Sequence, residues 1–300
     1  MLACGVNDST SVAAAPASLR IGPATLIFGV RTYIMGVINV SPESFSGDGL
    51  ASPEAALERA RRFIDDGADI LDVGGQSTRP GADKNAAGFD ELTPEEEVRR
   101  VVPAVEAIAC ALPAAAISVD TYKPAVARAA LDAGAHTLND IYGFRRDAEI
   151  ARIAAQRGVP AVAMYNQRGR PLVDGDVVAT VRAGFEESLR IAGEAGLARE
   201  RVVLDPGFGF GWSVEQNIEM LRRLRELTAL GLPLLVGTSR KSSIGAILGG
   251  AGTAERAFGT AASVALSVAN GADIVRVHDV DEMKQVVLVA DAVVRGWREA

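Results

Sequence analysis

Short apolar runs recur along the chain, and most of them end at a polar residue. Continuous Val/Ile/Leu runs are typical of parallel strands that are buried on both faces. The runs therefore predict a parallel sheet whose strands carry polar side chains at their carboxyl ends. The eight predicted strands are 33–39, 69–74, 116–120, 135–140, 160–165, 201–205, 233–237 and 273–278.

Amphipathic segments separate these runs and predict helices. Ser52 and Thr93 are each followed by Pro and an acidic residue, which is typical of a helix start. Gly67, Gly134 and Gly271 are each followed by Ala, and a Gly just past a helix is the common left-handed stop. The predicted helices are 51–66, 94–111, 123–133, 146–157, 177–195, 213–229, 241–249, 254–270 and 280–297.

The repeated strand–helix alternation predicts an α/β fold, a (β/α)8 TIM barrel with a short N-terminal extension. An open doubly wound sheet is the alternative, but the G-x-G-x-x-G turn that usually marks it is missing after the first strand. We expect residues 1–19 to form a disordered tail and 20–300 to form one catalytic domain. Within that domain, residues 20–33 are expected to form a hairpin that closes the barrel floor.

Two long, glycine-bearing loops follow the first two predicted strands, at 41–50 and 76–92. Loops of this length in a compact domain are often functional, and many act as lids over an active site. We therefore expect both loops to lie at the carboxyl end of the barrel and to cover a substrate there.

Composition narrows the class of protein. The net charge of −7 argues against a general nucleic-acid binder, which would need a basic face. Cys4 and Cys110 are too few for a disulfide framework, which indicates a reducing compartment. No run reaches the ~20 apolar residues that span a bilayer. We expect a cytoplasmic enzyme that holds any anionic ligand with local basic residues.

Four polar residues close or closely follow different predicted strands: Asp120, Asn139, Asp205 and Lys241. A barrel would bring them together at one mouth. Two carboxylates, an amide and an ammonium suit a flat heterocycle with an amino-pyrimidinone edge, because carboxylates accept its N–H groups and the other two meet a ring nitrogen and a carbonyl. Any single one of them could instead be a helix cap, a position that Asp and Asn favour.

A second group of residues suits an oxyanion such as phosphate. Arg276 and His278 lie two positions apart on one predicted strand and so share a face, and Arg79 lies in the second long loop. His278 could instead be a rim histidine paired with Asp279. Because no His/Cys cluster has zinc spacing, we expect any metal to be Mg²⁺ carried on a polyphosphate, with Asn39 as one ligand.

Two turns add to this pattern. The turn 205–211 is rich in glycine, which lets backbone approach a ligand closely, and Phe210 in it is suited to stack on a planar ring. The basic turn 237–242 suits an anion at the start of a helix. Each turn taken alone could also be an ordinary strand-to-helix connection.

Together these segments closely resemble the dihydropteroate synthase family of pterin-binding TIM barrels. The similarity runs from about residue 33 to 296. It rests on motifs in the family's order: MGVINVSPESFS at 35–46, DVGG at 72–75, STRPG at 77–81, SVDT at 118–121, NDI at 139–141, DPGFGFG at 205–211, SRKS at 239–242 and RVHDV at 276–280.

The resemblance implies a transferase of folate biosynthesis, usually a homodimer. It would join 6-hydroxymethyl-7,8-dihydropterin diphosphate to 4-aminobenzoate with Mg²⁺ and release diphosphate. The implied catalytic residues are Lys241, Asp120, Asp205 and Arg79. The implied pterin set is Asp120, Asn139, Met164, Asp205, Phe210, Gly237 and Lys241; the diphosphate set is Asn39, Arg79, Arg276 and His278, with Asn39 also at the metal; the 4-aminobenzoate set is Phe45, Thr78, Pro80 and Ser242.

The chain departs from the family's common pattern in several places. Gln76 stands where Glu is common, Trp212 stands where Lys is frequent, and 164–167 replaces a Met-His-Met type of segment. The first loop, 41–49, also carries its acid one position later. None of these changes touches the proposed pterin or diphosphate set, so we expect activity to be retained.

Two other functions fit the same fold. A methyltransferase acting on methyltetrahydrofolate would have no diphosphate to bind, and Arg79, Lys241, Arg276 and His278 favour the synthase over it. A non-catalytic pterin-binding paralogue would be indicated by loss of Arg79 or Lys241, and both residues are present.

Overall fold

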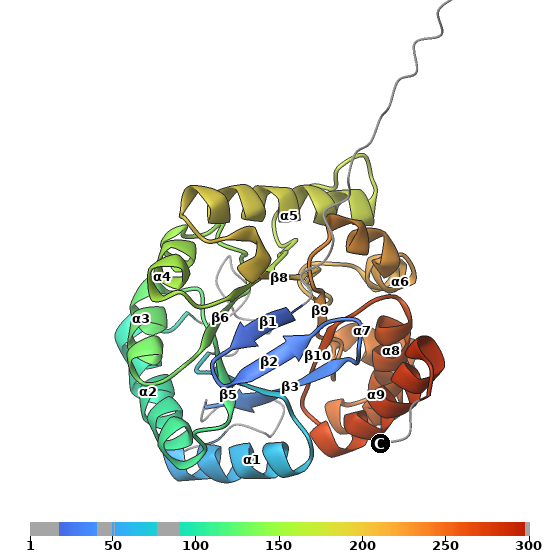
Figure 1. Ribbon diagram of the computed structural model, residues 1–300. Helices are drawn as coiled ribbons and strands as arrows, with labels where there is room; N and C mark the ends of the chain where they lie inside the picture. The colour runs from blue at the N-terminus through green and yellow to red at the C-terminus, as the bar shows by residue number, and fades with distance from the viewer. Residues whose placement is uncertain (1–17, 41–49, 51, 77–90, 298–300) are drawn as a thin grey trace, which may run out of the picture.

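The computed structural model describes residues 18–40, 50, 52–76 and 91–297. These residues form a barrel of parallel strands inside a ring of helices (Figure 1). The barrel strands are β3 (Tyr33–Asn39), β4 (Ile70–Gly74), β5 (Ala116–Asp120), β6 (Thr137–Asp140), β7 (Ala161–Met164), β8 (Val202–Asp205), β9 (Leu235–Val236) and β10 (Ile274–Val277).

The eight strands are ordered β8-β7-β6-β5-β4-β3-β10-β9. A parallel bridge between Leu204 and Leu234 joins β8 to the segment that leads into β9, so the two ends of the sheet meet. This closure confirms the barrel over the open doubly wound sheet.

Helices connect successive strands and cover the outside of the barrel (Figure 1). They are α1 (Pro53–Asp65), α2 (Pro94–Ala111), α3 (Pro124–Asp132), α4 (Glu149–Arg157), α5 (Val177–Glu194), α6 (Val214–Arg222), α7 (Ser242–Ile247), α8 (Ala257–Ala269) and α9 (Val280–Arg295), with 3-10 turns η1 (Arg199–Arg201), η2 (Leu224–Leu230) and η3 (Thr253–Glu255). In the described part of the chain, no helix is long and apolar enough to cross a membrane.

The helix predicted over 213–229 is wrong in its second half. The α-helix α6 ends at Arg222, and η2 follows as a 3-10 helix. Leu224 and Leu227 are both fully buried, and a spacing of three residues places them on one face of a 3-10 helix. Tertiary packing of these leucines therefore overrides the α-helical propensity of the segment.

The predicted hairpin at the barrel floor is confirmed. Strands β1 (Ser18–Ile21) and β2 (Ala24–Ile27) pair antiparallel around Gly22, whose φ of +56° favours glycine. The hairpin crosses the middle of the ring in Figure 1. Its buried side chains pack against the lowest inward layer of the barrel, in a cluster that contains Leu19, Ile21, Leu26, Met35, Ile70, Ala116, Val162, Val203, Leu235 and Ile274.

The hairpin begins two residues earlier than predicted. Ser18 and Leu19 belong to β1, and Leu19 is buried, so these two residues are not part of a tail. The remainder of the predicted tail lies outside the described residues.

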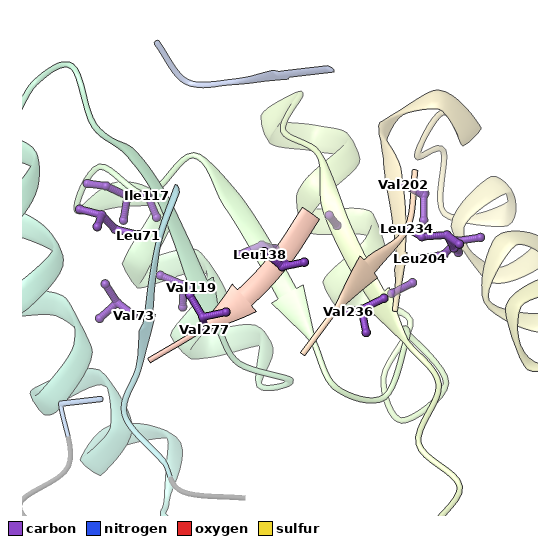
Figure 2. Close-up of a cluster of buried hydrophobic side chains, with 14 of the residues drawn as sticks. Leu71, Val73, Ile117, Val119, Leu138, Val202, Leu204, Leu234, Val236 and Val277 are labelled. Carbon is purple, nitrogen blue, oxygen red and sulfur yellow. The ribbon is translucent and has the colours of Figure 1, made fainter. Parts of the chain in front are cut away.

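A second apolar layer lies between the barrel and the helices. Figure 2 shows Leu71, Val73, Ile117, Val119 and Val277 among its members, all from barrel strands. These side chains alternate along each strand with residues that face the barrel interior. The strands are thus apolar on both faces near the floor, which explains the continuous Val/Ile/Leu runs of the sequence.

Candidate active site

The ends of four neighbouring strands lie in one row at the carboxyl end of the barrel, and three of them carry a polar side chain. The parallel register pairs Asn39 with Gly74, Gly74 with Asp120, and Asp120 with Asn139. The register thus brings three of the predicted site residues together.

Arg276 enters this row from the next strand, β10. Its Nε donates to Asp72 Oδ2 at 2.6 Å, and its Nη2 donates to Asp120 Oδ2 at 2.8 Å. Asn139 Nδ2 also donates to Asp72 Oδ2, at 3.0 Å. Burial lowers the pKa of Arg276, but the carboxylates of Asp72 and Asp120 outweigh that effect and raise the pKa above its ordinary value. The guanidinium therefore stays charged and holds the strand ends together.

Asp72 is a member of this site that sequence reasoning did not assign. Its side chain is 0% exposed, and within the described residues its Oδ1 has no hydrogen-bond partner. A buried carboxylate is costly unless it is paired, and here the paired oxygen serves both Arg276 and Asn139. The available signal was a single acidic residue inside an otherwise apolar strand.

The turn after β8 positions Asp205. Its Oδ1 accepts from the backbone N–H of Gly207 at 2.8 Å. Gly207 has a φ of +73°, and a Cβ there would lie 1.8 Å from the carbonyl oxygen of Tyr165, so only glycine allows this close approach.

Lys241 lies over the same turn, although it is the residue directly before α7. Its Nζ is 4.0 Å from the centre of the Phe210 ring, within the range of a cation–π contact. A Cβ on Gly209 would lie 2.8 Å from Lys241 Cδ, so the turn glycine also leaves room for the lysine stem. Lys241, Asp205 and Phe210 are therefore brought together as the sequence predicts.

Burial raises the pKa of both proposed pterin carboxylates. The pKa of Asp120 rises to about 7, because burial and the neighbouring charge of Asp72 outweigh the attraction of Arg276. The pKa of Asp205 rises to about 6, mainly through burial, against the hydrogen bond from Gly207 and the charge of Lys241. Perturbed carboxylates of this kind cluster at functional sites.

An apolar wall lies beside the charged groups. Tyr122, Ile141 and Met164 form one buried cluster, and Tyr142 and Phe210 pack against it. The rings of Tyr122 and Tyr142 meet edge-on with centres 5.2 Å apart. Hydrogen-bonding groups beside an apolar wall are the arrangement that a flat, polar-edged ring requires.

The helix-cap alternative is wrong for the three acidic and amide residues. The residues that cap the following helices are Lys123 for α3, Ala148 for α4 and Ser213 for α6. Asp120, Asn139 and Asp205 lie at the strand ends instead. By contrast, the carboxylate of Asp140 accepts from the backbone N–H groups of the following turn at residues 142 and 144, which is a structural role.

His278 lies at the mouth just after β10. Its Nδ1 is 2.9 Å from Ser239 Oγ, and its backbone N–H donates to the same hydroxyl at 3.2 Å. Asp279, the partner considered for it from the sequence, accepts from Arg240 Nε at 3.0 Å. His278 is thus hydrogen-bonded to the turn that follows β9.

The remaining predicted site residues divide into two groups. Gly237 is half-buried just after β9, and Ser242 is exposed at the first position of α7. Phe45, Thr78, Arg79 and Pro80 lie outside the described residues, as do most of the two predicted lid loops.

Comparison with known proteins identifies the class. Residues 35–278 match the family of pterin binding enzymes, and the chain therefore belongs to that family. Within it, the chain is similar to dihydropteroate synthases. The dihydropteroate synthase of Synechocystis is 43% identical over 290 residues, covering 94% of this chain and 96% of the relative. That of Bacillus subtilis is 42% identical over 259 residues, covering 86% of this chain and 87% of the relative.

A solved structure supports the same placement. The dihydropteroate synthase of Clostridium difficile, solved in the presence of pteroic acid, has a TM-score of 0.82 and 42% identity, covering 89% of this chain and 98% of that chain. The sequence-based prediction of the pterin-binding TIM barrel is confirmed.

Proposed function

We propose that this chain is a dihydropteroate synthase, a transferase of folate biosynthesis. It condenses 6-hydroxymethyl-7,8-dihydropterin diphosphate with 4-aminobenzoate and releases diphosphate. The observation that carries the proposal is the convergence of Asp120, Asn139, Asp205 and Lys241 at one barrel mouth, in a chain about 42% identical to several synthases. These relatives carry the synthase name, which favours this function over the methyltransferase and the non-catalytic paralogue.

The polar residues at the strand ends and the apolar wall would contact different parts of the pterin. Asp120, Asn139, Asp205, Gly237 and Lys241 would hold the polar edge of the ring, while Met164 and Phe210 would contact its faces. Carboxylates accept the N–H groups of the amino-pyrimidinone, and Lys241 and Asn139 donate to its carbonyl and ring nitrogens. The turn glycines would let Phe210 and Lys241 reach the ring.

Arg276 and His278 would bind the diphosphate at the rim, together with Asn39 and Arg79. The bonds to Asp72 and Asp120 use two of the five N–H donors of the Arg276 guanidinium. The other donors are suited to an oxyanion. A cation already fixed by two carboxylates also costs little to organise when the substrate arrives.

The donor set fits Mg²⁺ carried by the diphosphate. Mg²⁺ keeps several waters and takes few protein oxygens beside substrate phosphates. Asn39 at the end of β3 can supply one such oxygen, and the described residues contain no cluster of three His, Cys, Asp or Glu that would cage an ion. When bound, the ion would stabilise charge that grows on the departing diphosphate.

In the reaction, the bond between the exocyclic methylene carbon and the diphosphate oxygen breaks, and the amine nitrogen of 4-aminobenzoate forms a bond to that carbon and loses a proton. Arg276 and Arg79 would stabilise the leaving group, and the carboxylates of Asp120 and Asp205 would stabilise positive charge shared by the pterin ring. Phe45, Thr78, Pro80 and Ser242 would orient the aminobenzoate. Loops 41–50 and 76–92 would exclude water that competes for the same carbon.

A diphosphate-release assay tests this function. Purified protein with Mg²⁺ and the dihydropterin diphosphate should release diphosphate and form dihydropteroate only when 4-aminobenzoate is added. Release at the same rate without any amine would contradict the condensation. Lys241→Ala should weaken pterin binding by more than ~1 kcal/mol, the size of one charge-assisted contact.

The homodimer is part of the same proposal. Helices α8 and α9 pack against each other. Many exposed apolar residues lie on these two helices, on α7 and just after α7 and α9. Large exposed apolar patches mark interaction sites. The residues are Ile247, Leu248, Phe258, Leu266, Leu288, Val289, Val293, Val294 and Trp297. We further propose a cytoplasmic location and a single catalytic domain that includes the hairpin from Ser18 onward.

A further inference from the structure

Lys123 is a buried cation beside the active site that none of the proposed ligand sets includes. It directly precedes α3, and its side chain is 8% exposed. Its ammonium donates to Gln76 Oε1 at 2.6 Å, to the carbonyl oxygen of Leu92 at 2.6 Å and to Glu97 Oε2 at 2.7 Å. Three acceptors match the three N–H bonds of an ammonium, so the buried charge is fully satisfied.

The acceptors come from both sides of segment 77–90. Gln76 follows β4, whereas Leu92 and Glu97 lie just before and within α2. The two sides are also joined directly, because the backbone N–H of Leu92 donates to Gln76 Oε1 at 3.1 Å. The side chains of Gln76 and Lys123 therefore bring the two ends of this segment to one point.

A second branch of the network runs through Tyr122. Gln76 Nε2 donates to Tyr122 Oη at 3.1 Å, and Tyr122 Oη donates to Glu91 Oε1 at 3.0 Å. An amide at position 76 can accept from Lys123 and donate to Tyr122 at the same time, whereas a carboxylate can only accept. This chain has Gln where the family commonly has Glu. The Gln side chain allows Lys123 to donate to Gln76, Gln76 to donate to Tyr122, and Tyr122 to donate to Glu91.

The network is continuous with the proposed pterin site. Tyr122 and Lys123 follow Asp120 by two and three residues, and Tyr122 belongs to the apolar wall with Met164. A shift of Gln76 or Lys123 would therefore change the contacts of both Leu92 and Tyr122 of the wall.

We propose that Gln76 and Lys123 are positioning residues for the aminobenzoate side of the site, because they hold Gln76 and Leu92, which flank segment 77–90, together beside the pterin site. The inference rests on the proposed function, since Thr78 and Arg79, two and three positions after Gln76, are in the proposed substrate sets. Neither Gln76 nor Lys123 needs to touch a substrate for this role.

Gln76→Ala is the decisive variant. It removes the hydrogen bonds from Lys123 and Leu92 to Gln76 but keeps the ion pair between Lys123 and Glu97. Its KM for 4-aminobenzoate should rise about tenfold, the equivalent of one lost hydrogen bond. The Kd for 6-hydroxymethylpterin should change by less than about twofold. Gln76→Glu, which keeps the acceptors for Lys123 and Leu92, should recover most of the KM.

Asn270→Ala is the matched control. Asn270 Nδ2 also donates to a backbone carbonyl across two helices, that of Leu221 at 2.9 Å, but it follows α8 outside the site. Truncating it removes a similar bond and should leave the KM for 4-aminobenzoate unchanged. A KM equally raised in Asn270→Ala would indicate a general loss of stability and overturn the positioning role.

Hydrogen exchange supplies a readout that needs no activity. The Leu92 N–H, bonded to Gln76, should lose about tenfold protection in Gln76→Ala, because its acceptor is gone. Unchanged exchange and unchanged KM would overturn the inference even if the wild type is an active synthase. A wild type that releases no diphosphate, with Leu92 exchange altered as expected, would instead contradict the proposed function alone.

Discussion

The ion pair between Asp72 and Arg276 joins residues of the proposed diphosphate and pterin sets. Asp72 is fully buried, and its Oδ2 serves both Arg276 and Asn139. Arg276 in turn reaches Asp120. One residue thus fixes the orientation of three others, although it carries no ligand role in the family resemblance.

Asp72→Asn tests this arrangement at constant size. Removing the charge leaves Arg276 with Asp120 as its remaining carboxylate partner. Breaking a buried ion pair costs about 3–5 kcal/mol when no other partner remains, and less when one does. We expect the free energy of unfolding to fall by ~1–3 kcal/mol and the Kd for a pterin to rise at least about tenfold. Urea unfolding and calorimetric titration measure the two effects.

Asp69→Asn provides the control for that variant. Asp69 lies just before the same strand and pairs with Arg31 Nη1 at 2.9 Å at the opposite end of the barrel. Its loss should reduce stability without changing the Kd for the pterin. Equal loss of pterin affinity in both variants would show that Asp72 acts only through stability.

Asp120 predicts a pH dependence of pterin binding. Its pKa is raised to about 7 by burial, so the carboxylate is largely protonated below that pH and ionised above it. Because the ionised form accepts two N–H bonds, pterin affinity should increase by roughly tenfold from pH 6 to pH 8. Deprotonation of Asp205, with a pKa of about 6, would add to the lower part of that range.

The corresponding measurement is the Kd of 6-hydroxymethylpterin as a function of pH, in wild type and in Asp120→Asn. The amide of Asp120→Asn does not titrate, so the variant should bind the pterin more weakly. It should also lose most of the pH dependence of the Kd above pH 6.5, which lies between the pKa values of the two carboxylates. An identical pH profile in the variant would assign the titration to another group.

At the scale of elements, the β1–β2 hairpin acts as the floor of the barrel. It presents Leu19, Ile21 and Leu26 to the lowest inward layer, and it lies at the end opposite to the site. The hairpin therefore contributes to stability, while the strand ends and their turns contribute the chemistry.

Leu26→Ala should lower the free energy of unfolding by ~2–5 kcal/mol, because it leaves a cavity under a closed barrel. Leu26 is 1% exposed, whereas its neighbour Ile27 is 51% exposed. Ile27→Ala is thus a control in the same strand and should cost less than ~0.5 kcal/mol. Urea denaturation compares them; similar values would mean that the hairpin does not seal the core.

At the scale of the whole molecule, the exposed apolar residues gather on the helices of one side. Helices α7, α8 and α9 carry seven of them, Leu248 and Trp297 follow just after α7 and α9, and Phe258 and Val293 are 91% and 80% exposed. Such residues cost free energy in water unless a partner covers them. A second copy of the chain is the proposed partner.

Phe258→Asp combined with Val293→Asp should convert the protein to a monomer, since two charges would be buried in an apolar contact. Sedimentation velocity at micromolar concentration measures the change. Val173→Asp, an exposed apolar position before α5, should keep the wild-type state. A wild type that already sediments as a monomer would contradict the dimer.

Much of the site could be predicted because strand ends converge in any barrel. Asp120, Asn139 and Asp205 were each found from a polar residue at the end of an apolar run, and Arg276 was found because it shares a strand face with His278. The structure brings the four residues together. Asp72 was missed because it lies inside a strand, where pattern alone suggests a structural role. The 3-10 turn after α6 was missed because only the packing of Leu224 and Leu227 selects it.

The amino-acid sequence by itself determined the alternation of strands and helices, the (β/α)8 class, the floor hairpin and the residue types available at the mouth. These features depend on local periodicity, turn chemistry and hydrophobic pattern, which are properties of neighbouring residues. Only the tertiary structure decided which charges pair. Arg276 is 204 residues from Asp72 along the chain. Lys123, just before α3, binds both Gln76 after β4 and Leu92 before α2. Such pairs form because closing the barrel buries these groups together, where each charge requires a partner.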